Sequence, residues 1–312
     1  MNVVLSGATG FVGRRVSSVL VGKAGVNLTC VVRRLTSDAL GHDFKVRSLE
    51  PSTDWSDVLA GQEVVIHAAA RAHILRDEAP DPLAEYREIN VDATLNFASQ
   101  AAKAGVRRFI FISSIGVNGS SSLKPFTETD DLSPSDYYAQ SKLEAEQGLW
   151  EIADSTGLEI VIIRPPLIYG PDAPGNFGKL LKILNRKVPL PFGAIHNKRS
   201  LVSLDNLVDL IITCIDHSAA ANQVFLAGDG KDLSTTELLR GVSFAMSKPA
   251  RLIPVPAGLI LFAAALVGKK AVARRLLGTL QVDISKARNV LDWEPPLSVE
   301  EGLRRCFISG RD

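Results

Sequence analysis

Tyr138 and Lys142 are the two side chains whose types and spacing best suit proton transfer. They are four residues apart, which places them on one face of a helix. A phenol with a pKa near about 10 is a poor base at neutral pH, but a neighbouring ammonium favours its ionised form. Tyr138 would then exchange a proton with a hydroxyl or a carbonyl oxygen. The alternative is an exposed helix in which Lys142 pairs with Glu146, an interaction worth only about 0.3–0.5 kcal/mol.

The residues around this pair supply a helix start and a hydroxyl group. Ser133 predicts a helix cap, Pro134 suits the first helical position, and Asp136 suits the positive end of the helix. Further upstream, Ser113 and Ser114 end the apolar run that begins at Phe109. Ligands of open α/β sheets bind at the carboxyl ends of the strands, so a serine there would donate a hydrogen bond to the reacting oxygen. The alternative is simple turn chemistry.

Gly7, Gly10 and Gly13 form the segment GATGFVG, directly after an apolar run and at the start of a predicted helix. In this context the first glycine permits a tight turn, and the second lets backbone N–H groups approach a pyrophosphate. The third lets the helix pack closely on the sheet. The pattern therefore predicts a dinucleotide-binding loop, the alternative being a glycine-rich turn without a ligand.

Arg33 and Arg34 end the second apolar run, where a loop that prefers NAD usually has an acid for the ribose hydroxyl. Two arginines would attract a 2′-phosphate instead, through charge-assisted hydrogen bonds. We therefore favour NADP(H) over NAD(H), the alternative being a pair of solvated surface arginines.

These groups need strands and helices to position them. Buried strands are predicted at Val3–Ser6, Leu28–Val32, Val64–His67, Phe109–Ser113 and Glu159–Ile163, with helices such as Phe11–Leu20 and Leu83–Ala104 between them. This alternation predicts an α/β fold with a doubly wound parallel sheet. The sequence RPPLIYGPDAPGN, from Arg164 onward, predicts a loop.

Shorter elements follow that loop. Helices are predicted near Phe177–Asn185, Leu207–Asp216 and Ser234–Met246 and a strand near Ser200–Ser203, with Asp205 and Ser234 as helix caps. We expect a dinucleotide-binding domain over 1–165, to which the chain returns near 200–227, and a smaller substrate-binding domain over 166–312.

Composition excludes several classes of protein. The 312 residues carry 35 basic and 34 acidic side chains, so a nucleic-acid binder that relies on bulk positive charge is not expected. Three distant cysteines and the absence of a leader segment favour a reducing, cytoplasmic location. The longest apolar run, Ala257–Val267, is too short to span a bilayer. A buried helix is the favoured interpretation of it, and a membrane-surface helix or a partner contact is the alternative.

The histidines show no metal-ligand spacing, so no metal site is expected. His67 is interpreted as a strand-end histidine with satisfied hydrogen bonds. His73 follows the third strand and is a candidate for lining a substrate pocket by its position.

Taken together, these motifs resemble the extended short-chain dehydrogenase/reductase family, over nearly the whole chain. The matching segments are GATGFVG (Gly7–Gly13), VVIHAAA (Val64–Ala70), NVDATLN (Asn90–Asn96), FISSIGVNG (Phe111–Gly119), YAQSK (Tyr138–Lys142) and IIRPPLIYGP (Ile162–Pro171). The resemblance implies a Rossmann-type fold and a catalytic set of Ser114, Tyr138 and Lys142. The implied cofactor-binding residues, with the two arginines added, are Gly7, Gly10, Phe11, Val12, Gly13, Arg33, Arg34, Ala68, Ala69, Ala70, Asn90, Tyr138, Lys142, Pro165 and Leu167.

Within the family, the chain is most similar to enzymes that act on nucleotide sugars. The resemblance implies a UDP-sugar substrate, with Asn176 and Arg199 at its diphosphate, and a homodimer. Ser114, and His73 by its position, complete the predicted substrate-binding set. Pro165-Pro166-Leu167 replaces the aromatic–Asn segment of UDP-galactose epimerases. With the arginine pair, this favours an NADPH-dependent 4-reductase of a UDP-4-keto-6-deoxy-hexosamine in surface polysaccharide biosynthesis. The alternatives are a UDP-sugar 4-epimerase and a non-catalytic NADP(H) sensor, and the retained Ser114, Tyr138 and Lys142 argue against the sensor.

Overall fold

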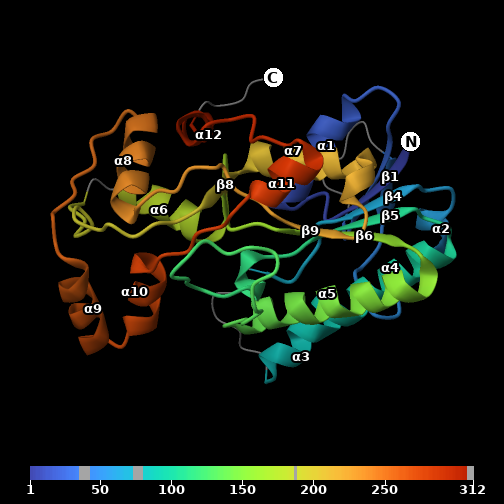
Figure 1. The fold of residues 1–312 in the computed structure, drawn as a ribbon, viewed down its shortest axis with the longest axis horizontal. Helices are drawn as coiled ribbons and strands as arrows, with labels where there is room; N and C mark the ends of the chain where they lie inside the picture. Colours follow the sequence, from blue (N-terminus) through green and yellow to red (C-terminus); the bar gives the residue numbers. More distant parts are fainter. Residues whose placement is uncertain (35–42, 73–79, 186–187, 308–312) are drawn as a thin grey trace.

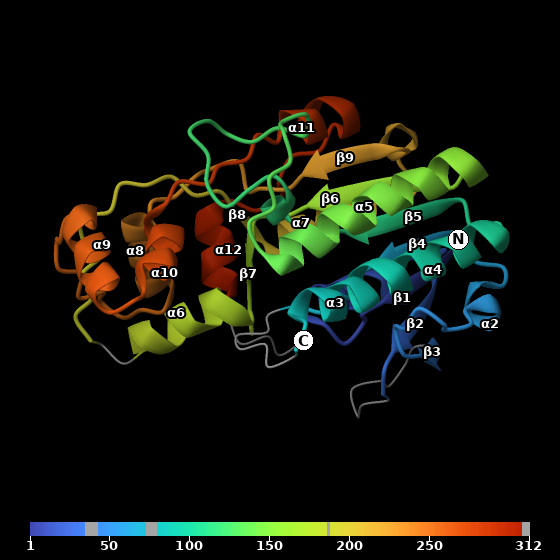
Figure 2. The same cartoon turned by 90° about the horizontal axis from the view of Figure 1, so that it is seen from below.

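A computed structural model of the chain describes residues 1–34, 43–72, 80–185 and 188–307. Within these residues, seven parallel strands form one sheet in the order β3-β2-β1-β4-β5-β6-β9 (Figures 1 and 2). The strands are β1 (Asn2–Ser6), β2 (Asn27–Val32), β3 (Asp43–Val46), β4 (Val64–His67), β5 (Arg108–Ile112), β6 (Glu159–Arg164) and β9 (Gln223–Leu226). The predicted doubly wound sheet is confirmed, while β3 and β9 were not among the predicted strands.

Helices cover both faces of the sheet, as Figure 2 shows from below. Side chains of β1 alternate between the two layers, with Val3 and Leu5 in one core and Val4 in the other. The first core is closed by α1 (Phe11–Val21), α7 (Leu204–Asp216) and α11 (Ser285–Leu291), and the second by α2 (Ser56–Leu59), α4 (Ala93–Lys103) and α5 (Tyr137–Thr156). The central strands β1, β4, β5 and β6 are mostly apolar because both of their faces are buried.

The helix predicted over Leu83–Ala104 is divided into three parts. An α-helix, α3 (Pro82–Arg87), passes into a π-helical turn, η1 (Glu88–Asp92), before α4 begins at Ala93. The wider turn carries the buried Asn90, whose amide bonds two other segments described below. Apolar periodicity alone does not reveal such a turn, because it leaves the apolar pattern of the helix nearly unchanged.

The second half of the chain contributes to both parts of the molecule. The smaller part of the molecule contains the two-stranded pair β7 (Leu167–Tyr169) and β8 (Leu201–Ser203). It also contains the helices α6 (Gly175–Asn185), α8 (Thr235–Ala245), α9 (Ala257–Leu266), α10 (Lys270–Leu277) and α12 (Val299–Arg305). The chain returns to the large sheet through α7 and β9, and again through α11. A division into domains at residue 165 stays a prediction.

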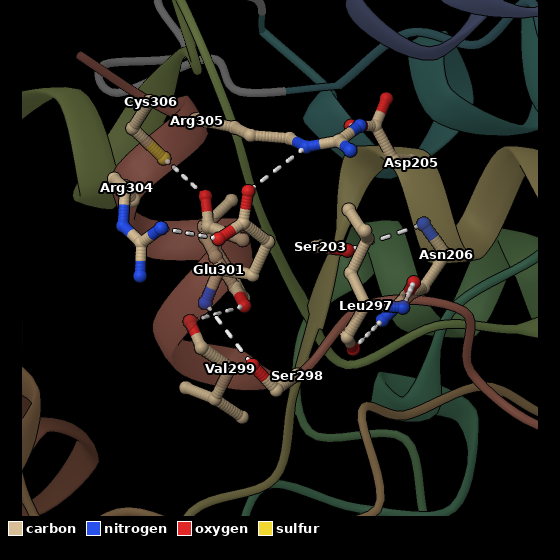
Figure 3. Close-up of polar contacts among 12 residues, drawn as sticks. Ser203, Asp205, Asn206, Leu297, Ser298, Val299, Glu301, Arg304, Arg305 and Cys306 are labelled. Atoms are coloured by element: carbon tan, nitrogen blue, oxygen red, sulfur yellow. Dashed lines mark hydrogen bonds and ion pairs between the residues drawn. The ribbon is translucent and has the colours of Figure 1, made fainter. Parts of the chain in front are cut away.

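Helix α12 is fastened to the start of α7 (Figure 3). The buried side-chain amide of Asn206 donates to the Leu297 carbonyl at 2.9 Å and accepts from the Leu297 N–H at 2.9 Å. The Arg305 guanidinium is 3.0 Å from the Asp205 carboxylate, which also accepts from Arg15 of α1 at 2.7 Å. These contacts tie the smaller part of the molecule to the helix layer that covers the sheet.

Three local predictions were wrong. Ser203, not Asp205, caps α7, because its hydroxyl accepts from the Asn206 N–H, whereas Ser234 caps α8 as predicted. The segment predicted as loop holds strand β7 and the start of α6. The apolar run after Ala257 forms a helix, α9, but none of its residues is buried. Among the described residues, no helix has the length and apolarity needed to cross a bilayer.

Candidate active site

The glycine loop lies where β1 ends and α1 begins, against the segment that follows β4. Gly7 has a φ of +76°, and a Cβ there would lie 2.6 Å from the Ala69 nitrogen. A Cβ on Gly13 would lie 2.1 Å from the Gly7 carbonyl oxygen. Gly7 therefore permits both the turn and the close approach of two backbones. Gly13 therefore permits the close approach of α1 to the residues that directly follow β1.

The outer side of this loop suits an anionic ligand. Gly10 is exposed, is the N-terminal cap of α1, and donates its N–H to the Gly7 carbonyl at 2.8 Å. The first turn of α1, with partly exposed Phe11 and Val12, contains no acidic side chain. The N–H groups at this helix end attract a phosphate, so the loop fits the pyrophosphate of a dinucleotide. Ala68 and Ala69 are partly exposed and Ala70 exposed at the neighbouring strand end.

Arg33 and Arg34 are exposed at the end of β2. With Thr9 of the glycine loop and Ser48, they line an open hollow. Their place beside the loop is the one that the sequence predicted. A 2′-phosphate on the ribose of a dinucleotide would lie within reach of two guanidinium groups there.

Tyr138 and Lys142 lie in the first two turns of α5, which begins at Tyr137. Asp136 caps the helix by accepting from the Ala139 N–H at 2.8 Å, so the predicted cap at Ser133 was wrong. The Lys142 ammonium is buried, donates to the Ile112 carbonyl at 2.8 Å and lies 4.2 Å from the ring centre of Phe111.

The pKa values of this pair differ from the expectation. Burial lowers the pKa of Lys142 to about 7, although Glu146 acts in the opposite direction. Burial, with the charges of Asp136 and Tyr86, raises the pKa of the Tyr138 phenol. The ammonium lies 6.0 Å from the Tyr138 ring centre and is hydrogen-bonded to a backbone carbonyl. The chain's own groups thus keep the phenol protonated, and additional positive charge beside it is needed to favour the phenolate.

Ser114 starts a short 3₁₀ turn, η2 (Ile115–Val117), at the end of β5. Its hydroxyl oxygen accepts from the Gly116 N–H at 3.1 Å and is partly exposed. A Cβ on Gly116 would lie between this oxygen, at 3.3 Å, and the Ala139 Cβ, at 3.2 Å. The turn therefore packs against the first turn of α5, which carries Tyr138. Pro165 closes the other side, since its carbonyl accepts from the Ile115 N–H at 3.0 Å.

A buried ionic network lies behind these residues, and the sequence did not predict it. The Arg164 guanidinium is 3.0 Å from one Glu146 oxygen and 2.5 Å from the other, and it donates to Asn118 at 3.1 Å. Ser113 donates its hydroxyl to Glu146. Two features of the sequence could have indicated this network. Glu146 shares the helix face of Lys142, and Arg164 ends a strand in which the four preceding residues are apolar. A paired and hydrogen-bonded network holds α5 against the ends of β5 and β6.

Asn90 and His67 are positioning residues. The Asn90 amide accepts from the Arg71 N–H at 2.8 Å and donates to its carbonyl at 3.1 Å and to the Ser141 hydroxyl at 2.9 Å. It joins the segment after β4 to α5. His67 is buried and hydrogen-bonded to Ser6 at 2.6 Å and to Thr94 at 3.0 Å, so its satisfied state is confirmed.

Of the predicted substrate-binding residues other than Ser114, the structure describes Arg199 and Asn176 but not His73. Arg199 lies in the smaller part, where its guanidinium donates to the Gly278 carbonyl at 3.2 Å and its backbone pairs with Leu233. Asn176 lies in the first turn of α6. His73 is outside the described residues. Leu167, of the predicted cofactor set, is partly exposed at the start of β7.

Among the described residues, no group of three or more His, Cys, Asp or Glu side chains could hold a metal ion. The arrangement instead combines a phosphate-binding turn with a buried tyrosine and lysine at the carboxyl ends of neighbouring strands. That combination defines a dinucleotide-dependent enzyme of the short-chain dehydrogenase/reductase type.

Comparison with known proteins gives the family. Residues 3–228 match the NAD dependent epimerase/dehydratase family, and the chain belongs to it. The chain is 46% identical to a UDP-glucose 4-epimerase of Vibrio cholerae over 307 residues, which cover 97% of this chain and 94% of that protein. The resemblance inferred from the motifs is thereby confirmed.

Two further comparisons also cover nearly the whole length of both chains. An N-acetyl-alpha-D-glucosaminyl-diphospho-ditrans,octacis-undecaprenol 4-epimerase of Escherichia coli O157:H7 is 29% identical, over 98% of this chain and 94% of that one. The crystal structure of a UDP-glucuronic acid 4-epimerase from Bacillus cereus in complex with NAD has a TM-score of 0.79 at 20% identity, covering 98% of this chain and 97% of that one. At this low identity, the structural likeness shows the shared fold alone.

Proposed function

We propose that the protein is a UDP-sugar 4-epimerase, which inverts the C4 hydroxyl of its substrate by oxidation and reduction. The observation that supports this most is the 46% identity to a UDP-glucose 4-epimerase over nearly the full length of both chains. The site provides the groups that this reaction needs, a dinucleotide loop beside a tyrosine, a lysine and a serine. Its cytoplasmic location and homodimeric state stay predictions.

The tyrosine, the serine and the lysine each have a role in this proposal. Bound to the glycine loop, a nicotinamide dinucleotide supplies a hydride acceptor and donor. Tyr138 takes the proton of the C4 hydroxyl as that carbon is oxidised. The 4-keto sugar then turns its opposite face to the cofactor, and Tyr138 returns the proton as the carbon is reduced. Ser114 donates a hydrogen bond to the same oxygen. Lys142 holds the cofactor ribose.

A second candidate is the UDP-4-keto-6-deoxy-hexosamine 4-reductase, and the arginine pair favours it. Arg33 and Arg34 beside the glycine loop suit NADPH, which a reductase consumes and must exchange at every turnover. An epimerase recovers its cofactor and has no need of that exchange. For the epimerase we propose NAD, the cofactor in the description of the family to which the chain belongs. The preference for NADP(H) belongs to the second candidate.

Purified enzyme with NAD distinguishes the candidates. With UDP-glucose or UDP-N-acetylglucosamine, we expect the C4 epimer to accumulate, as seen by proton NMR, without net change in the absorbance of reduced nicotinamide. Loss of NADPH absorbance with a UDP-4-keto sugar, and no epimer from either substrate, would establish the reductase. The absence of both reactions would contradict the proposal.

The Tyr138→Phe variant tests the mechanism. It lacks the hydroxyl that exchanges the proton, so we expect turnover to fall roughly 10²–10⁴-fold while dinucleotide affinity is retained. Tyr137→Phe is a matched control, because the Tyr137 side chain is adjacent but 54% exposed. Equal loss of activity in both variants would contradict the assignment to Tyr138.

A further inference from the structure

The pair of helices α9 and α10 takes no part in the proposed chemistry. We call this pair, residues 257–277, the apolar hairpin. Both views place it at the end of the molecule that is remote from β1, β2 and β3 (Figures 1 and 2). Helix α9 has the sequence AGLILFAAAL, with no polar side chain on any face and no buried residue. A helix of this composition normally lies inside a protein core or in lipid.

The exposure of the apolar hairpin is large for a monomeric protein. The exposed fractions are 60% for Leu259, 65% for Phe262, 74% for Leu266, and 67% for both Val267 and Val272. Single exposed apolar residues are ordinary, but a contiguous group on one helix pair marks a contact with another body. The ten residues of α9 rise about 15 Å, only half the thickness of a bilayer core. Such a helix could enter one leaflet but not cross the membrane.

The charge around the apolar hairpin indicates what it contacts. Between residues 238 and 282, all seven charged side chains are basic: Arg240, Lys248, Arg251, Lys269, Lys270, Arg274 and Arg275. The rest of the chain holds the other 28 basic residues against all 34 acidic ones. This segment therefore carries a charge of +7, although the net charge of the whole chain is only +1. Lys269, Lys270 and Arg274 are exposed on the hairpin itself.

We propose that the apolar hairpin docks the protein on an anionic lipid bilayer. The side chains of α9 enter the interface, and Lys269, Lys270 and Arg274 contact lipid phosphates. A second copy of the chain is a poorer occupant of this surface. A two-fold contact would bring the same cations of both copies together, without a carboxylate in the segment to neutralise them.

Docking would hold the predicted diphosphate residue Arg199 near the membrane. The Gly278 carbonyl, directly after α10, accepts from the Arg199 guanidinium at 3.2 Å and from the Asn197 amide at 2.9 Å. The hairpin and the predicted diphosphate residue therefore belong to one hydrogen-bonded unit. The docking proposal rests on exposure and charge, and it stands whichever reaction the site catalyses.

Sedimentation of the full chain with vesicles tests the proposal. We expect binding to vesicles of mixed phosphatidylcholine and phosphatidylglycerol, weakened by added salt, and little binding to phosphatidylcholine alone. Lys269→Gln with Lys270→Gln should weaken binding roughly 25-fold, at about fivefold per charge. Phe262→Ser with Leu266→Ser should weaken it roughly tenfold or more. Neither change should lower the unfolding midpoint, since α9 has no buried residue.

Matched variants far from the hairpin provide the controls. Lys23→Gln with Lys103→Gln removes two exposed cations, and Val46→Ser removes a side chain that is 44% exposed on β3. These should leave vesicle binding unchanged. If the wild-type chain fails to bind anionic vesicles at low salt, or if hairpin and control variants bind alike, the proposal is wrong. It is also wrong if Phe262→Ser with Leu266→Ser converts an oligomer to a monomer in analytical ultracentrifugation and leaves vesicle binding unchanged.

Discussion

At the scale of single residues, the sequence reveals the chemistry but not the state of the groups that perform it. The spacing of Tyr138 and Lys142 on one helix face was predictable, because helix geometry fixes it. The bond from the Lys142 ammonium to the Ile112 carbonyl was not, because it depends on how α5 packs against β5. For the same reason, the Arg164–Glu146 pair appears only when strand end and helix are brought together.

His67 provides a pH-dependent test at this scale. Its burial, with the charge of Lys142, lowers its pKa to about 3 from about 6.5 in the unfolded chain. Below pH 6.5 the unfolded chain takes up a proton that the folded chain does not. Folding stability is therefore lost as the pH falls from 6.5, by about 2 kcal/mol at pH 5. In urea unfolding, the loss of folding stability between pH 7 and pH 5 should be about 2 kcal/mol smaller for His67→Gln than for the wild type. His196→Gln, on an exposed side chain, should retain the wild-type loss.

At the scale of elements, the presence of a helix or strand was easier to predict than the residues at which it begins and ends. The helix after the glycine loop was predicted from Phe11 to Leu20 and ends at Val21. Asp136 rather than Ser133 caps α5, because only the structure shows which oxygen faces the first free N–H group. The short strands β3 and β7 were missed, since their four and three residues carry too little pattern to distinguish them from loops.

The junction of β1 and α1 offers a test that separates the steric clash of an added Cβ from the cost of a positive φ. Gly7→Ala would force a Cβ to 2.6 Å from the Ala69 nitrogen, in addition to a positive φ. We expect a loss of roughly 3 kcal/mol in unfolding free energy and weaker binding of dinucleotide. Gly25→Ala has nearly the same φ, +79°, with nothing within 4 Å of the added atom. It should cost roughly 1 kcal/mol and leave dinucleotide binding intact. Equal costs would show that the backbone contact at Gly7 is unimportant.

At the scale of the whole molecule, the sheet is completed by distant parts of the chain. Phe225, Leu291 and Trp293 belong to the same apolar core as Val3 and Leu5. The doubly wound sheet was predictable from alternating strands and helices. The return of α11 was not, because a seven-residue helix near the end of the chain does not show by its pattern which surface it covers.

This shared core predicts that residues 1–165 do not fold alone. The fragment lacks α7, β9 and α11, so one face of its sheet would be covered by α1 alone and would remain largely exposed. We expect aggregation or binding of a hydrophobic dye, and no cooperative transition in urea, whereas the whole chain should unfold cooperatively. A sharp, reversible transition of the fragment, followed by circular dichroism, would show that the two parts are energetically independent.

The position of β1 in the middle of the sheet has a consequence for biosynthesis. The first strand to leave the ribosome pairs with β2 and β4, but the helix layer on this face of the sheet is completed by α11, which packs on β9 and is translated near the end. Throughout most of translation, the nascent polypeptide must therefore keep a half-covered apolar surface in contact with water or a chaperone. Slow elongation over the last third of the message should accordingly favour capture by heat-shock proteins.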